Sequence, residues 1–167
     1  MYRVYRGNAN EVLLEISAFR VRDNPYEDLA EGYYILNTNI SNSQEDHDDM
    51  LRNAKAAAHS DPWKHKIERL DKGDVVFLYQ TGVGIVALGN ADGKVQKAAC
   101  HWNPESAEEE YFMKLRQFRR VSPPLTAAEV KKLTGINYVF MSTMFGVDAD
   151  SGKRIREFLH DQGRLQD

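Results

Sequence analysis

The sequence has few features that would place it in a membrane or outside the cell. It contains one cysteine, Cys100, which cannot form an intramolecular disulfide, and this favours a reducing compartment such as the cytoplasm. No apolar run approaches the roughly 20 residues that a membrane-spanning helix needs. Residues 1–6 lack the apolar stretch of a secretion signal. These absences predict a cytoplasmic chain with no membrane partner.

An excess of positive charge is also missing. The chain has 22 lysines and arginines against 25 aspartates and glutamates, a net charge of −3, which argues against nucleic-acid binding by overall charge. The charge is segregated, however: residues 44–49 and 105–110 are acidic, whereas residues 113–132 are mostly basic. A local basic face could therefore contact phosphates, although a solvated surface of mixed charge explains the composition equally well.

Common catalytic motifs are absent too. There is no Gly-x-Ser-x-Gly elbow, no Gly-Lys-Ser/Thr phosphate loop, and residues 82–84 (Gly-Val-Gly) lack the third glycine of a dinucleotide turn. Residues 46–49 (Asp-His-Asp-Asp) would point in different directions on a helix, so they are a weak metal site. Cys100 and His101 are adjacent, whereas a thiol and its base usually meet across the fold. We therefore expect no cofactor and no metal, and the sequence favours a binding protein over an enzyme.

A length of 167 residues, 42% of them apolar, fits one domain with one core. The clearest pattern is a turn at residues 72–74 followed by the β-branched and aromatic run 75–79, a glycine-rich turn and a second apolar run at 85–88. Short strands joined by such turns predict an antiparallel meander, with a third strand beginning at 94–97.

Helices and further strands are predicted on either side of this meander. Ser43 with Asp46 fits the start of a helix over residues 45–58, and Thr126 with Glu129 forms a capping box. The other predicted elements are a strand at 33–36, a strand at 111–118, a connector at 122–126, a helix at 127–133, a strand at 137–141, a loop at 142–146 and a helix from Asp150 or Ser151 to Leu159. The whole is a mixed α/β domain.

Residues 67–91 resemble the centre of the EVE domain family, which belongs to the PUA-like superfamily with YTH and ASCH domains as relatives. Residues 33–39 resemble that family's first strand, and residues 111–118 and 121–130 resemble later elements. The resemblance implies an α+β fold: a PUA-like β-barrel of about five to six mostly antiparallel strands flanked by helices, over residues 32–167. Residues 1–31 have no counterpart and are expected to be an extension packed on the domain.

The resemblance also implies a groove for nucleic acid and, in the EVE and YTH branches, a modified base turned out into an aromatic pocket. Trp63 and Trp102 lie in polar stretches outside the periodic core pattern, in the order expected of two cage residues. Each could equally cap an end of the barrel. Tyr79, at the end of the central strand, is a further candidate, although it also fits the core.

Two sets of polar residues complete the predicted site. Candidates to read the edge of a base are Asn37, Thr38, Asn39, Ser142 and Thr143, for which turn and cap roles are an equally good explanation. Candidates to bind phosphate are Lys64, Lys66, Arg116, Arg119 and Arg120, for which an ordinary solvated surface is the alternative.

The leading hypothesis is a non-catalytic module that reads a modified, for example methylated, base in DNA or RNA. One alternative is a hydrolase acting on nucleic acid or modified nucleotides, for which Cys100, His101 and the acidic residues would be the first candidates. Another is a protein-interaction module on the same barrel. The sequence does not predict an oligomeric state.

Overall fold

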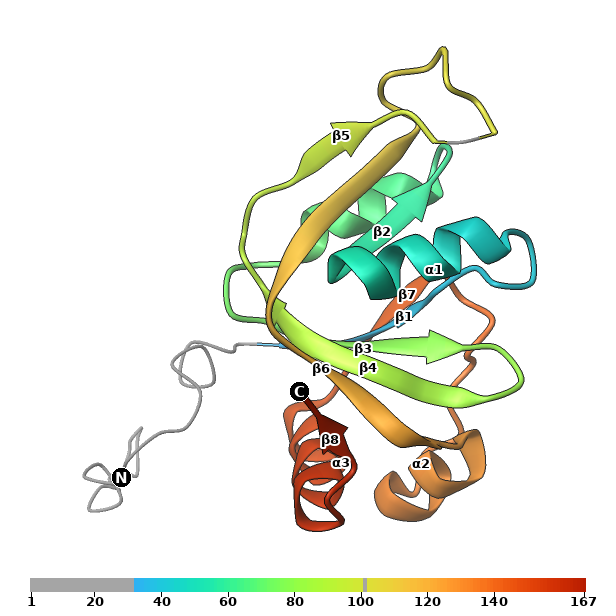
Figure 1. Cartoon of the computed structure of the whole chain (residues 1–167). Coiled ribbons are helices and arrows are strands. Elements are labelled where there is room, and N and C mark those ends of the chain that lie inside the picture. Colours follow the sequence, from blue (N-terminus) through green and yellow to red (C-terminus); the bar gives the residue numbers. More distant parts are fainter. Residues whose placement is uncertain (1–31, 101) are drawn as a thin grey trace.

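The computed structural model describes residues 32–100 and 102–167 (Figure 1). The predicted N-terminal extension, residues 1–31, and His101 lie outside this part of the chain. The described elements are, in order, β1 (Tyr33–Asn37), α1 (Gln44–Asn53), β2 (Lys55–His59), the 3-10 helix η3 (Trp63–Arg69), β3 (Val75–Gln80), β4 (Gly84–Ala91), β5 (Gln96–Ala98), β6 (Glu110–Leu125), α2 (Ala127–Thr134), β7 (Met144–Val147), α3 (Ala149–Asp161) and β8 (Leu165–Gln166). None of these helices is long and apolar enough to cross a membrane.

The strands form one curled sheet in the order β2-β6-β4-β3-β1-β7, and β5 and β8 also pair with β6. Only the β1–β3 pairing is parallel among the pairings of the described strands. The long strand β6 runs the length of the molecule, with β2 and β5 at one end and β4 at the other (Figure 1). The predicted α+β barrel of mostly antiparallel strands, flanked by helices, is confirmed.

The central strand β3 is buried on both faces, which explains its unbroken apolar sequence. Val76 and Leu78 belong to a core cluster that includes Met50 of α1, Ala57 of β2 and Ile67 of η3. Residues Val75, Phe77 and Tyr79 belong to a second cluster with Ile155 and Leu159 of α3. The sheet therefore separates the side of α1, β2 and η3 from the side of α3.

The helix predicted over residues 45–58 begins as expected but ends early. The Ser43 side chain accepts a hydrogen bond from the Asp46 amide at 3.1 Å. Ala54 then adopts a left-handed conformation with φ 50°, and residues 55–59 form β2, paired with β6. The prediction was wrong over 55–58 because buried pairing with β6 overrides the helix propensity of the alanines.

Three further predictions need correction. Residues 122–125 are the end of β6, where Leu125 pairs with Ile85 of β4, and not a connector. Residues 137–141 were expected to form a strand, but their aromatic side chains pack on the second core cluster without strand pairing. The strand is β7, which lies where a loop was expected. Helix α3 begins two to three residues earlier than predicted: Asp148 caps it by accepting from the Ser151 amide at 3.0 Å. The capping box at Thr126 is confirmed.

Replacing Gly152 with alanine tests how closely α3 approaches β1. A Cβ at this position would overlap the ring of Tyr33. In an open helix alanine is more stable than glycine by about 1 kcal/mol, but here overpacking should lower the free energy of unfolding by about 1–3 kcal/mol, measured by urea denaturation. The exposed neighbour Lys153→Ala is the control and should change little. A stabilised Gly152→Ala variant would contradict the close packing.

Candidate functional site

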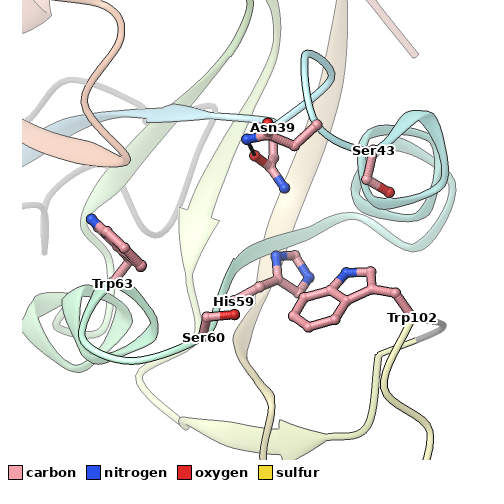
Figure 2. A pocket seen from close by; sticks show the side chains of 7 residues that line it. Asn39, Ser43, His59, Ser60, Trp63 and Trp102 are labelled. Carbon is pink, nitrogen blue, oxygen red and sulfur yellow. Dashed lines mark hydrogen bonds between the residues drawn. The ribbon is translucent and has the colours of Figure 1, made fainter.

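An open pocket of about 400 Å³ lies where the loops after β1, β2 and β5 meet (Figure 2). This volume suits a small ligand or a single base. Its lining residues come from the turn after β1, the cap of α1, the end of β2, the start of η3 and the loop between β5 and β6. They are Asn39, Asn42, Ser43, His59, Ser60, Trp63 and Trp102.

The two tryptophans stand on opposite sides of this pocket, with His59 between them (Figure 2). Trp63 is 52% exposed and Trp102 is 46% exposed, which is unusual for the largest apolar side chain. The ring of Trp102 lies 6.4 Å from the ring of His59, tilted by 58°. Folding thus brings together two half-exposed indole rings that are far apart in the sequence.

His59 forms the deepest part of the pocket wall and lies between two carboxylates. Its side chain is only 7% exposed, and its Nε2 is 3.6 Å from Asp46 Oδ1 and 3.8 Å from Glu110 Oε1. The Nζ of Lys55 lies 2.6 Å from Glu110 Oε2 and 2.6 Å from Asp49 Oδ2. A buried network of charged side chains therefore supports the pocket from behind.

Interactions within this network favour the ionised forms of Glu110 and Lys55. Burial acts to raise the pKa of Glu110, but His59 and Lys55 outweigh it, so this pKa lies below its ordinary value. Burial acts to lower the pKa of Lys55, but Asp49 and Glu110 outweigh it, so that pKa is raised. Buried charges are tolerated when they are paired in this way.

Carboxylates also position the other polar residues of the pocket. Asp46 Oδ2 accepts a hydrogen bond from Asn39 Nδ2 at 3.1 Å, and the Asp46 amide donates to Ser43. On the other wall, Ser60 Oγ donates to Glu109 Oε2 at 2.9 Å. Asn39 and Ser60 both have φ 67°, a left-handed conformation that turns the chain sharply at the pocket edge.

Asn39 is the one polar base-reading candidate that lines the pocket. Asn37 instead donates from Nδ2 to the carbonyl of Phe140 at 2.9 Å. The buried Thr38 hydroxyl lies 2.7 Å from His47 Nδ1. The carbonyl of Thr143 accepts from the Asn37 amide at 2.9 Å, and the neighbouring Ser142 likewise does not line the pocket. The structure thus gives these four residues contacts in the loops beside the pocket.

Tyr79 is not brought to the pocket. It is 6% exposed, belongs to the second core cluster and stacks on Phe140 with ring centroids 4.1 Å apart and an interplanar angle of 12°. Burial raises the pKa of its hydroxyl. Its place at the end of β3 serves the packing of the loop before β7.

The phosphate candidates lie in two groups. In η3, Lys64 is buried and donates to the carbonyl of Glu108 at 2.8 Å, and Lys66 donates to the carbonyl of Met144 at 3.3 Å. On β6, Arg119 donates to the carbonyls of residues 165 and 166, whereas Arg116 and Arg120 are exposed. Phosphate binding by these residues stays a prediction.

The pocket contains residues that the sequence did not single out as site residues. Asn42, Ser43, His59 and Ser60 line it, and the carboxylate of Asp46 lies behind it. The wrong helix prediction over 55–58 hid two of them, because His59 and Ser60 reach the pocket only when a strand ends there. An interrupted alanine run followed by two polar residues before Asp61-Pro62 was the available signal.

Cys100, His101 and the acidic residues were the first candidates for an enzyme. Burial raises the pKa of the Cys100 thiol, which lowers the fraction of the nucleophilic thiolate. Its neighbour His101 lies outside the described residues. Within residues 32–100 and 102–167, no three His, Cys, Asp or Glu side chains are arranged to hold a metal ion.

The similarity of this chain to other proteins lies in its fold. No protein-family model matches the sequence, and no curated protein matches it significantly. A hypothetical protein from Leishmania major is similar with a TM-score of 0.55 and 15% identity, covering 80% of this chain and 97% of that one. A protein from Pseudomonas syringae has a TM-score of 0.51 and 13% identity, covering 76% of this chain and 99% of its own.

A YTH domain is also similar. The YTH domain of Mmi1, solved in complex with RNA, has a TM-score of 0.53 and 11% identity, covering 81% of this chain and 84% of that one. At these identities the likeness shows the fold alone. The described part of the chain has a YTH-like fold, and these matches do not decide the resemblance to EVE domains.

Replacing Lys55 with methionine tests the network behind the pocket. The change should lower the free energy of unfolding by about 3–5 kcal/mol, because it leaves the buried Glu110 carboxylate without its lysine. Adding Glu110→Gln should restore part of the loss. Lys114→Met is a matched control, since Lys114 is opposite Lys55 in the β2–β6 register but exposed. Equal effects of the two lysine variants in urea denaturation would contradict a structural role for Lys55.

The same network predicts acid sensitivity. Because the pKa of Glu110 in the folded protein lies below its value of 4.5 in the unfolded chain, the unfolded state binds more protons as the pH falls. The stabilisation is present above this value and is lost as the pH drops through the folded-state pKa. Glu110→Gln should therefore have a shallower decline in melting temperature with acidification; an unchanged decline would rule out this contribution.

Proposed function

We propose that this chain is a nucleic-acid-binding module whose pocket accepts one base, in a modified form, turned out of its strand. The observation that carries the proposal is the shared pocket of Trp63 and Trp102. Two half-exposed indole rings facing one polar cavity are costly to leave in water and are well suited to hold a flat ring between them. From the sequence alone, the two tryptophans were expected in two different loops.

The energetics fit this task. Turning a base out of a stack costs a few kcal/mol, and stacking on an aromatic side chain returns about 1–3 kcal/mol per base. A methyl group buried in the pocket adds about 0.8 kcal/mol. A tryptophan-lined pocket can therefore offset the cost of extrusion and prefer a methylated base.

Polar groups around the rings supply the means of reading a base edge. The amides of Asn39 and Asn42 carry both donors and acceptors, and the imidazole of His59 can act as either. The hydrogen bond from Asn39 to Asp46 fixes the orientation of one of these amides. A fixed set of donors and acceptors penalises bases that do not match it.

The fold supports the same proposal. The YTH domain of Mmi1 that shares this fold was solved with RNA, and we propose RNA or DNA as the partner of this chain as well. The resemblance of residues 67–91 to the centre of EVE domains supports the same proposal. Arg116 and Arg120, which are exposed on β6, are the proposed phosphate contacts, and binding should weaken as salt increases.

Binding assays with matched oligonucleotides test the proposal. Single-stranded RNA and DNA carrying methylated, hydroxymethylated or unmodified bases should be compared by fluorescence anisotropy at low salt. Trp63→Ala and Trp102→Ala should each weaken binding by about tenfold or more, the equivalent of a lost stacking contact. Met141→Ala removes an exposed apolar side chain outside the pocket and should bind normally.

Three results would count against all or part of the proposal. No binding of any oligonucleotide at low salt would exclude nucleic acid as the ligand. Normal binding by the Trp63→Ala, Trp102→Ala double variant would show that nucleic acid binds at another surface. Equal affinity for modified and unmodified bases would retain the pocket but remove its preference for a modification.

A further inference from the structure

Carboxylates lie directly behind several residues of the pocket wall. Asp46 is 5% exposed, contacts Asn39 through Oδ2 and lies 3.6 Å from His59 Nε2 through Oδ1. Glu110, 4% exposed, approaches the same nitrogen at 3.8 Å. On the opposite wall Glu109 accepts hydrogen bonds from Ser60 and, at 3.4 Å, from Asn103. Three carboxylates thus each contact a side chain that lines the cavity.

Positive charges near the pocket offset this excess only in part. Lys55 is shared between Asp49 and Glu110, so one lysine serves two carboxylates. At the rim, the ammonium of Lys64 lies 3.6 Å from Asp61, and that of Lys97 lies 3.6 Å from Glu108. These rim pairs are neutral. The potential inside the pocket is therefore negative, and partial burial strengthens it.

The tryptophans add to the same preference. The face of an indole ring carries negative potential and attracts a cation placed over it, more strongly than the rings of tyrosine or phenylalanine do. Both Trp63 and Trp102 line the cavity and are half-exposed, so their rings are accessible. Ring faces and carboxylates act together on any ligand held between them.

We propose that the pocket selects a base carrying a positive charge, that is, a base alkylated on a ring nitrogen. This inference rests on the proposed function and narrows its ligand class. Bases such as 1-methyladenine, 3-methylcytosine and 7-methylguanine are cationic near neutral pH. Their ring charge is attracted by the tryptophan faces and by Asp46, Glu109 and Glu110, whereas a neutral base gains only stacking and apolar burial.

Cationic selection also resolves a conflict between the pocket and its polymer. A nucleic-acid strand brings its own negative phosphates towards this acidic cavity, which opposes binding of an ordinary base. A positive charge on the base removes that penalty at the position where it is largest. Unmodified strands are therefore rejected by repulsion as well as by the loss of an attractive contact.

Isomeric bases give a direct test. 1-Methyladenine and N6-methyladenine have the same heavy atoms, but the first carries an extra proton and a positive charge. The same holds for 3-methylcytosine and 5-methylcytosine. Oligonucleotides of one sequence, each with one of these bases, should be titrated against the full chain by fluorescence anisotropy at pH 7. The cationic isomer of each pair should bind at least about tenfold more tightly, which is a modest difference in binding free energy.

Charge-removing variants assign the preference to the carboxylates. Asp46→Asn should lower the affinity ratio of cationic to neutral isomer. Because Asp46 is buried and hydrogen-bonded, the half-buried Glu109→Gln is the second variant, in case the first does not fold. Glu157→Gln, exposed on α3, is the control. Melting temperatures establish which variants are folded.

The outcomes separate this inference from the proposed function. The inference is supported if the cationic isomers bind more tightly than the neutral ones and this preference falls in Glu109→Gln or Asp46→Asn. Equal or tighter binding of the neutral isomers overturns charge selection while the base-binding function stands. A preference unchanged in both folded variants overturns the role of the carboxylates. No binding of any oligonucleotide overturns both.

Discussion

The pairing of β2 with β6 is the constraint on which the rest of the structure depends. It places His59 opposite Glu110 in the register, at the end of the sheet where the pocket opens. The other end of β6 pairs with β4 and β8, so one strand joins β2 and β5 to the rest of the curled sheet. Curvature of the barrel and the position of the pocket wall therefore have a common origin in the backbone hydrogen bonds of β6.

That pairing also buries charged side chains, and their mutual compensation links stability to the site. Lys55 enters the sheet beside two carboxylates, and Glu110 holds both Lys55 and His59. The cost of desolvating these ions is balanced only while all of them stay in place. The carboxylates behind the pocket outnumber the lysine that faces them, and this arrangement is the basis of the proposed preference for a cationic base.

Local rules were sufficient for much of the fold and less of the site. The β-branched run 75–79, the glycine turns around it and the caps at Ser43 and Thr126 depend on neighbouring residues, and the structure has them as expected. The helix prediction over residues 55–58 was wrong because alanines fit a helix or a strand, and only pairing with β6 decides between the two. The strand prediction at residues 137–141 was wrong because apolar side chains of a loop can be buried without strand pairing.

For the site, the sequence by itself determined that Trp63 and Trp102 lie outside the core pattern, because large apolar residues among polar neighbours cannot belong to a periodic buried face. Only the tertiary structure decided that both line one pocket, that Tyr79 does not, and that Asp46, His59 and Glu110 lie together behind it. The physical reason is distance along the chain. Contacts between a helix, a strand end and the start of another strand arise from sheet register, which no local pattern encodes.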